Sequence, residues 1–143
     1  MNNLLELPII RGVGWGELVL GTTRENVKRF LNEDGINKCL FESCYFLEYP
    51  NFGILINYNL ANKVNTIFFY NNDLGYEHMS LIPIKTKENI GWNSSPFDIK
   101  EAYGIPYESF EGIENNVIWQ RFVYNGVNFR FLDRKLVRIS INY

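Results

Sequence analysis

Only a few side chains in this sequence have the chemistry of an acid–base or nucleophilic catalyst. His78 is the sole histidine and stands next to Glu77, so a Ser–His or Cys–His mechanism would have a single possible base. No serine or cysteine stands in a recognisable nucleophile setting such as G-x-S-x-G. We therefore expect His78 to be a surface or boundary residue, and we expect no catalytic residue in this chain.

A metal site and a carboxylate pair are the remaining chemistries. Cys39 and Cys44 are the only cysteines, and with His78 they would form an incomplete ligand set that lacks C-x-x-C spacing. Asp98 and Glu101 would share one face of a helix. The helix dipole favours an acid such as Asp98 in the first turn, and Glu101 is expected to be a solvated surface charge. The sequence therefore predicts neither a metal site nor a cofactor.

Acidic and aromatic side chains are better candidates, and they point to protein binding. Glu108, Glu111 and Glu114 flank Phe110 in a segment that we predict to be an acidic loop. A basic partner could engage this combination of charge and ring. The alternative is a solvated connection with Phe110 tucked beneath it.

Two predicted strands carry more aromatic rings than one core face can hold. Phe68, Phe69 and Tyr70 are consecutive, and a strand alternates its side chains, so at least one ring lies on the second face of the sheet. Residues 119–122 raise the same problem. Such rings either fill the groove between helix and sheet or anchor a protein interface. Our candidate partner-binding residues are Phe68, Tyr70, Glu108, Phe110, Glu111, Glu114, Trp119 and Arg121.

The composition limits the class of partner. The chain has 143 residues, of which 46% are hydrophobic and 16% aromatic, and a domain of this length buries roughly 70% of its unfolded surface. The net charge of −2 is too balanced to hold nucleic acid or an anionic membrane. No stretch approaches the ~20 apolar residues of a membrane span, and the N-terminus lacks the pattern of a signal peptide. We therefore expect a cytoplasmic protein.

Local signals predict two helices, each followed by three strands. The first helix is predicted over residues 23–32, with Thr22 as its cap and Glu25 in the capping-box position. The second is predicted over 96–103, with Ser95 as its cap and Pro96 in its first turn. The alternation of apolar and polar residues predicts strands at 44–48, 54–58, 64–70, 117–124, 127–132 and 136–143.

The connecting segments carry weaker signals. Residues 12–16 alternate glycine with other residues, but a strand-like stretch follows them in place of a helix, so we predict a turn and not a dinucleotide site. Residues 71–75 are a cluster of turn-forming residues that marks the joint between two halves. Residues 81–84 are predicted to form a connecting or edge strand, because Pro83 cannot donate to a sheet.

The two halves of the sequence can be laid on each other. Residues 20–28 align with 92–100, and residues 49–70 align with 124–142. This repetition predicts an α+β fold of two repeated helix-plus-three-strand antiparallel meander units that form a joined or adjacent sheet. We expect one domain over residues 1–143 made of two lobes, with the first repeat at 16–72 and the second at 88–143.

The helix-start phrase also resembles that of a known fold. A leucine–glycine–threonine–threonine phrase that opens a charged helix is formed by Leu20, Gly21, Thr22, Thr23, Glu25, Val27 and Leu31, and is matched loosely by Trp92, Ser94, Ser95, Ile99, Tyr103 and Gly104. With the recurring meander, it resembles the tandem α/β fold of the β-lactamase-inhibitory protein and the small outer-membrane-assembly lipoproteins. The resemblance implies a sheet whose exposed face grips another protein, and not an enzyme. The sequence departs from the pattern of those secreted families, because we expect neither a signal peptide nor a lipobox cysteine nor the disulfides of the inhibitor.

These observations predict a non-enzymatic protein-binding module. The predicted type is an immunity or antitoxin protein that neutralises a toxin domain, and its acidic segment would suit a basic toxin domain such as a nuclease. One alternative is a small-ligand or enzymatic domain with a pocket between the lobes, lined by Glu77, His78 or Arg121. Another is a homodimer that pairs the aromatic sheet face with its own copy.

Overall fold

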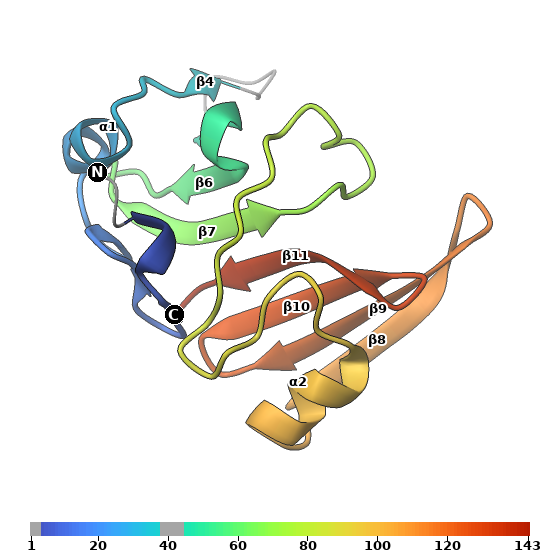
Figure 1. Cartoon of the computed structure of the whole chain (residues 1–143). Helices are drawn as coiled ribbons and strands as arrows, with labels where there is room; N and C mark the ends of the chain where they lie inside the picture. The colour runs from blue at the N-terminus through green and yellow to red at the C-terminus, as the bar shows by residue number, and fades with distance from the viewer. Residues whose placement is uncertain (1–3, 38–44) are drawn as a thin grey trace.

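The fold is a mixture of helix and sheet in which the sheet predominates. The computed structural model describes residues 4–37 and 45–143. They form a small three-stranded sheet, an eight-stranded antiparallel sheet and two α-helices (Figure 1). The α+β class and the joined sheet expected from the sequence are confirmed, while the equivalence of the two halves stays a prediction.

The small sheet occupies the N-terminal segment. A 3-10 turn at Leu4–Glu6 precedes β1 (Ile9–Ile10), β2 (Gly14–Trp15) and β3 (Leu18–Val19). At Gly14 φ is +144°, and an added Cβ would lie 2.1 Å from the Leu18 carbonyl oxygen. The glycine therefore allows the close approach of β2 to β3. The turn predicted at residues 12–16 is wrong in part, because Gly14 and Trp15 within it form strand β2, while the strand-like stretch after it is β3.

Helix α1 (Arg24–Leu31) begins one residue later than predicted. Thr23 Oγ1 accepts a hydrogen bond from the Asn26 backbone N–H, while Thr22 Oγ1 accepts from the Asn26 side chain. The helix ends at Asn32, which is left-handed. The prediction of Thr22 as the cap is therefore wrong: two adjacent threonines offer the same chemistry, and it is Thr23, with an extended backbone, that accepts from the backbone N–H of the first turn.

Helix α2 (Pro96–Tyr103) has the predicted bounds. Ser95 accepts from the Asp98 backbone N–H, and the Asp98 carboxylate accepts from the Ser95 N–H, which completes a capping box. Asp98 is therefore engaged in the helix start, as expected for an acid in the first turn of a helix.

The large sheet is assembled from both halves of the chain. Its strand order is β4-β5-β6-β7-β11-β10-β9-β8, and its halves join where β7 pairs with β11 at Ile67 and Ile141. Figure 1 shows β4 and β8 at the two ends of the sheet. The strands are β4 (Ile36–Asn37), β5 (Phe46–Tyr49), β6 (Ile54–Tyr58), β7 (Val64–Tyr70), β8 (Glu108–Glu114), β9 (Val117–Tyr124), β10 (Val127–Leu132) and β11 (Lys135–Ile141).

Two connecting segments differ from their predictions. The predicted acidic loop is strand β8, which pairs with β9 over its whole length. Residues 81–84 form no strand, because Ile82 and Ile84 turn into the core from an irregular chain around Pro83. With β4 in the first half and β8 in the second, each half has four strands in the large sheet and not three. The predicted strand at 44–48 begins at a residue outside the described part of the chain, and β5 covers Phe46–Tyr49.

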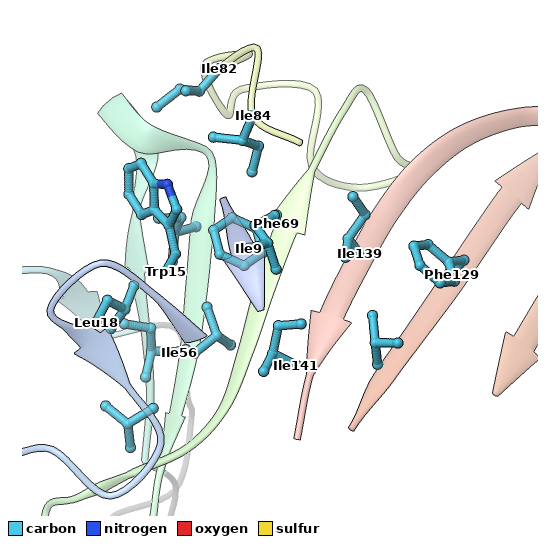
Figure 2. Packing of buried hydrophobic residues seen from close by; sticks show 14 of the residues in the cluster. Ile9, Trp15, Leu18, Ile56, Phe69, Ile82, Ile84, Phe129, Ile139 and Ile141 are labelled. Carbon is cyan, nitrogen blue, oxygen red and sulfur yellow. The ribbon is translucent and has the colours of Figure 1, made fainter. Parts of the chain in front are cut away.

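One face of the large sheet, the core face, holds the main hydrophobic core. Figure 2 shows Trp15 of the small sheet near Phe69 of the first half of the large sheet, and the same buried cluster continues through Ile139 to Phe129 of the second half. Val27 and Leu31 of α1 and Ile99 of α2 belong to the same buried cluster. Both helices thus contribute to the cluster on the core face. We call the opposite face of the large sheet the outer face.

Candidate functional site

The strand register places most of the predicted binding residues on the outer face. Side chains directly opposite on neighbouring strands share a face, and Phe110 pairs with Arg121 while Gly112 pairs with Trp119. The same rule extends across the sheet to Tyr70 through Arg138. Seven of the eight candidates share the outer face by this register, namely Phe68, Tyr70, Glu108, Phe110, Glu114, Trp119 and Arg121.

Glu111 is the exception among the candidates. It pairs with Gln120, which in turn pairs with the fully buried Phe131 of the core face. Its side chain therefore projects from the core-face side of the β8 edge and does not join the other seven.

Three arginines form a row across the outer face. Arg138 of β11 lies opposite Arg130 of β10, which lies opposite Arg121 of β9. Like charges directly opposite on neighbouring strands are destabilising. We call Arg121, Arg130 and Arg138 the arginine row. Repulsion between these charges lowers the stability of the sheet.

Each arginine of the row lies over an aromatic ring. The guanidinium carbon is 4.7 Å from the Phe110 centroid for Arg121, 5.7 Å from the Trp119 centroid for Arg130, and 5.9 Å from the Phe68 centroid for Arg138. These distances are within the range of cation–π attraction. A Cβ on Gly112 would lie 2.8 Å from Trp119 Nε1, so the absent side chain leaves room for the indole across β8.

The charges of the row are neutralised unevenly. Asp73, 2% exposed, has its Oδ1 3.2 Å from Arg130 Nε and its Oδ2 3.9 Å from Arg138 Nη1. Glu114 Oε2 lies 3.5 Å from Arg130 Nη2. Within residues 4–37 and 45–143, Arg121 has no ion pair, and its buried Nε has no hydrogen-bond acceptor. Arg121 is therefore the cation of the row whose charge is least compensated.

A short segment of the chain closes the other part of the outer face. Residues 73–79, which we call the cover segment, place Tyr76 in a stack on Tyr70 with ring centroids 4.1 Å apart, and Met79 packs with Leu55 and Tyr70. Tyr70 is only 3% exposed, and this burial raises the pKa of its phenol. Tyr70 therefore lies beneath the cover segment and does not reach the surface.

The sole histidine fastens the same segment. His78 Nε2 lies 2.8 Å from Glu48 Oε1, and the Glu48 side chain is 4% exposed while that of His78 is 47% exposed. This position agrees with the expected surface or boundary residue. The contact ties the cover segment to strand β5.

The remaining outer face over β8 to β10 stays accessible. Phe110 is 39% exposed, the Glu114 side chain is 53% exposed, and Trp119 and Arg121 are half-buried. Asp73, Arg130 and Arg138 belong to this site but were not among the residues predicted for it. The two arginines were visible only as the polar positions of alternating strands, and Asp73 only as part of a turn.

A groove lies elsewhere, between α2 and the segment before it. Its volume is about 590 Å³, and its lining includes Lys85, Glu88, Trp92 and Glu101. It does not include Glu77, His78 or Arg121, the residues expected for a pocket between the lobes. In the described part of the chain no group of three His, Cys, Asp or Glu side chains is placed to hold a metal, while Cys39 and Cys44 lie outside that part.

No described helix has the length and apolar character to cross a bilayer. No protein-family model matches the sequence, and no curated protein matches it. A crystal structure of a DUF4309 family protein (YjgB) from Bacillus subtilis subsp. subtilis str. 168 is similar, with a TM-score of 0.55 and 10% sequence identity over 99% of this chain and 90% of that chain. At this identity the likeness concerns the fold alone.

Proposed function

We propose that this chain is a non-enzymatic protein-binding module whose partner docks on the outer face over strands β8 to β10. The observation that carries the proposal is the arginine row, with each guanidinium over an aromatic ring on a face that the described chain leaves accessible. Arginine, tryptophan and tyrosine are the residues that most often dominate protein interfaces. A partner would also relieve the like-charge cost of the row.

Further support comes from the way the site is built. Trp119 lies over Gly112, and Asp73, the first residue of the cover segment, holds Arg130 and Arg138 in place. Side chains fixed before binding lose little conformational freedom on association, which favours affinity. The outer face therefore has the organisation expected of a preformed interface.

The type of partner is a narrower proposal. We propose an immunity or antitoxin-type inhibitor that neutralises a toxin domain in the cytoplasm, supported by the balanced charge of −2 and by the mixed acidic and aromatic edge of the sheet. We also propose that the two halves are copies of one helix-plus-meander unit. Pairing of the two copies between β7 and β11 would explain why the outer face is broad.

Affinity capture with matched variants tests the proposal. The tagged protein, its Trp119→Ala/Arg121→Ala double variant and a Gln120→Ala control are used to capture proteins from a lysate of the source organism, followed by mass spectrometry. Gln120 is on the same strand but on the core face. We expect a stoichiometric partner that the wild type and Gln120→Ala retain and the double variant loses. Equal retention by all three, or no stoichiometric partner, contradicts the proposal.

A further inference from the structure

Strand β8 ends the large sheet with its outer edge open. It is the last strand in the order, and it pairs on one side with β9 over seven residues. Six of its seven residues are exposed. Among the described residues none pairs with its other side. Such an edge offers a row of backbone donors and acceptors to another strand.

Apolar side chains flank this edge on both faces. Ile113 is 75% exposed and lies opposite Ile118, which is 55% exposed. Phe110 is on the outer face, and Tyr107, just before the strand, is 80% exposed. An added strand would cover apolar surface above and below the sheet, which favours association beyond the backbone hydrogen bonds.

The charges of the edge argue against a second copy of this chain as the occupant. Glu108, Glu111 and Glu114 are the only charged residues of β8. In a full antiparallel β8–β8 pair, Glu108 would face Glu114 of the copy and Glu111 would face its own equivalent. Directly opposed like charges destabilise a sheet, so the glutamates oppose self-association.

The same charges favour a basic strand. Glu108 and Glu111 have no ion-pair partner within the described part of the chain, and Glu114 is shared with Arg130. The spacing of three residues is the same in both chain directions, so it selects a charge pattern in the incoming strand whichever way that strand runs.

We propose that β8 is completed by an extended segment of the partner protein that joins the sheet as a ninth strand, with a basic residue at every third position and an apolar residue opposite Ile113. This inference rests on the proposed function, because the strand would extend the interface from the outer face around the edge. Recognition thus combines backbone pairing with three charge contacts.

A peptide experiment tests this without the partner. The probe is acetyl-Lys-Ile-Thr-Arg-Val-Thr-Lys-amide, titrated into the ¹⁵N-labelled chain. Two matched peptides accompany it: an acidic analogue with Glu in place of Lys and Arg, and an analogue N-methylated at alternate residues. We expect chemical-shift changes and slowed amide exchange at residues 108–114, binding at least about tenfold weaker for the acidic analogue, and no protection by the N-methylated one.

Variants of the chain sharpen the test. The double substitution Glu108→Gln/Glu111→Gln should weaken binding of the basic peptide about threefold to tenfold, since exposed ion pairs contribute about 0.2–1 kcal/mol each. The control Glu25→Gln/Glu101→Gln removes the same charge from the two helices and should change affinity less than twofold. No shift at β8 with millimolar peptide, equal binding of the acidic analogue, or protection by the N-methylated analogue would each overturn the inference.

The inference and the proposed function can fail separately. If a captured partner is lost by Trp119→Ala/Arg121→Ala but the peptide shows no binding at β8, the outer-face proposal stands and the added strand is refuted. If the peptide binds β8 as expected and every variant captures the same proteins, the outer-face proposal fails and the edge remains.

Discussion

The outer face of the sheet is closed over strands β5 to β7 and open over strands β8 to β10, although both parts carry aromatic rings. In the closed part, the cover segment lays Tyr76 on Tyr70 and ties His78 to Glu48. In the open part, Arg121 lies over Phe110 with no counter-charge in the described chain. The described chain therefore covers one half of the outer face with its own residues and leaves the other half accessible.

Asp73 stands at the boundary of the two parts, and its removal should have the largest effect. The Asp73→Ala substitution leaves Arg130 and Arg138 opposed without their buried counter-charge. Breaking a buried ion pair on one side costs about 3–5 kcal/mol, so we expect the free energy of unfolding in urea to fall by about 3 kcal/mol. The exposed Glu101→Ala serves as the control, and a loss below about 1 kcal/mol at Asp73 would show that the row needs no such neutralisation.

Truncation of Tyr76, the residue of the cover segment that stacks on Tyr70, should lower the stability of the protein. Tyr76→Ala removes the stack on Tyr70, and an aromatic pair contributes about 0.5–1.5 kcal/mol beyond the area it buries. We expect a loss of about 1–2 kcal/mol in urea unfolding and an alkaline titration of Tyr70 that moves to lower pH. Tyr107→Ala, at an 80% exposed ring, is the matched control with little expected effect. Unchanged stability in both variants would mean that the cover segment does not seal the face.

Buried tyrosines predict that stability depends on pH, and Tyr70 of the closed part contributes to this dependence. Burial raises the pKa values of Tyr49, Tyr58, Tyr70, Tyr103 and Tyr124 above the usual 10.0. Because the folded pKa exceeds the unfolded one, the contribution to stability is complete below pH 10 and is lost as the pH rises towards the folded pKa. The free energy of unfolding, measured in urea, should therefore decrease as the pH rises above 10. Tyr70→Phe should reduce this fall by about 1 kcal/mol per pH unit.

The control for this titration is Tyr107→Phe, an exposed phenol in the segment that leads into β8. It should leave the alkaline slope as in the wild type. A slope that is identical in Tyr70→Phe and the wild type would contradict the burial of Tyr70 beneath the cover segment.

The smallest effect has an unusual sign. Arg121→Ala removes a like charge that lies directly opposite Arg130, so we expect stability to remain unchanged or to rise by up to about 0.5 kcal/mol. Arg121→Lys, which keeps the charge, is the matched variant and should show no gain. A loss above about 1 kcal/mol in Arg121→Ala would indicate that this arginine serves the fold and not a partner.

Much of this fold follows from local pattern, and strand β8 is the main exception. Strands β6, β7, β9 and β10 have the predicted bounds because each is rich in β-branched, aliphatic and aromatic residues and is followed directly by Asn or Asp, which favour turns. Strand β8 was predicted as a loop because it is an edge strand with both faces near water, so its glutamates break the alternation that identifies a strand.

The site was predictable only in part. The alternation of side chains required rings on a second face, and the register places Phe110, Trp119 and Phe68 there. That Asp73 neutralises two arginines depends on contacts between residues far apart in the sequence, and that Tyr70 is covered depends on a turn that folds Tyr76 back onto it. Local sequence pattern carries no information on such pairings.

The most direct test of the account compares the two parts of the outer face in binding. The purified partner is titrated by calorimetry against Arg121→Ala in the open part and His78→Ala in the closed part, with the wild type as reference. We predict a loss of affinity of at least about tenfold for Arg121→Ala and a change within twofold for His78→Ala. The reverse order, or equal affinity for all three proteins, would contradict the assignment of the open part as the binding surface.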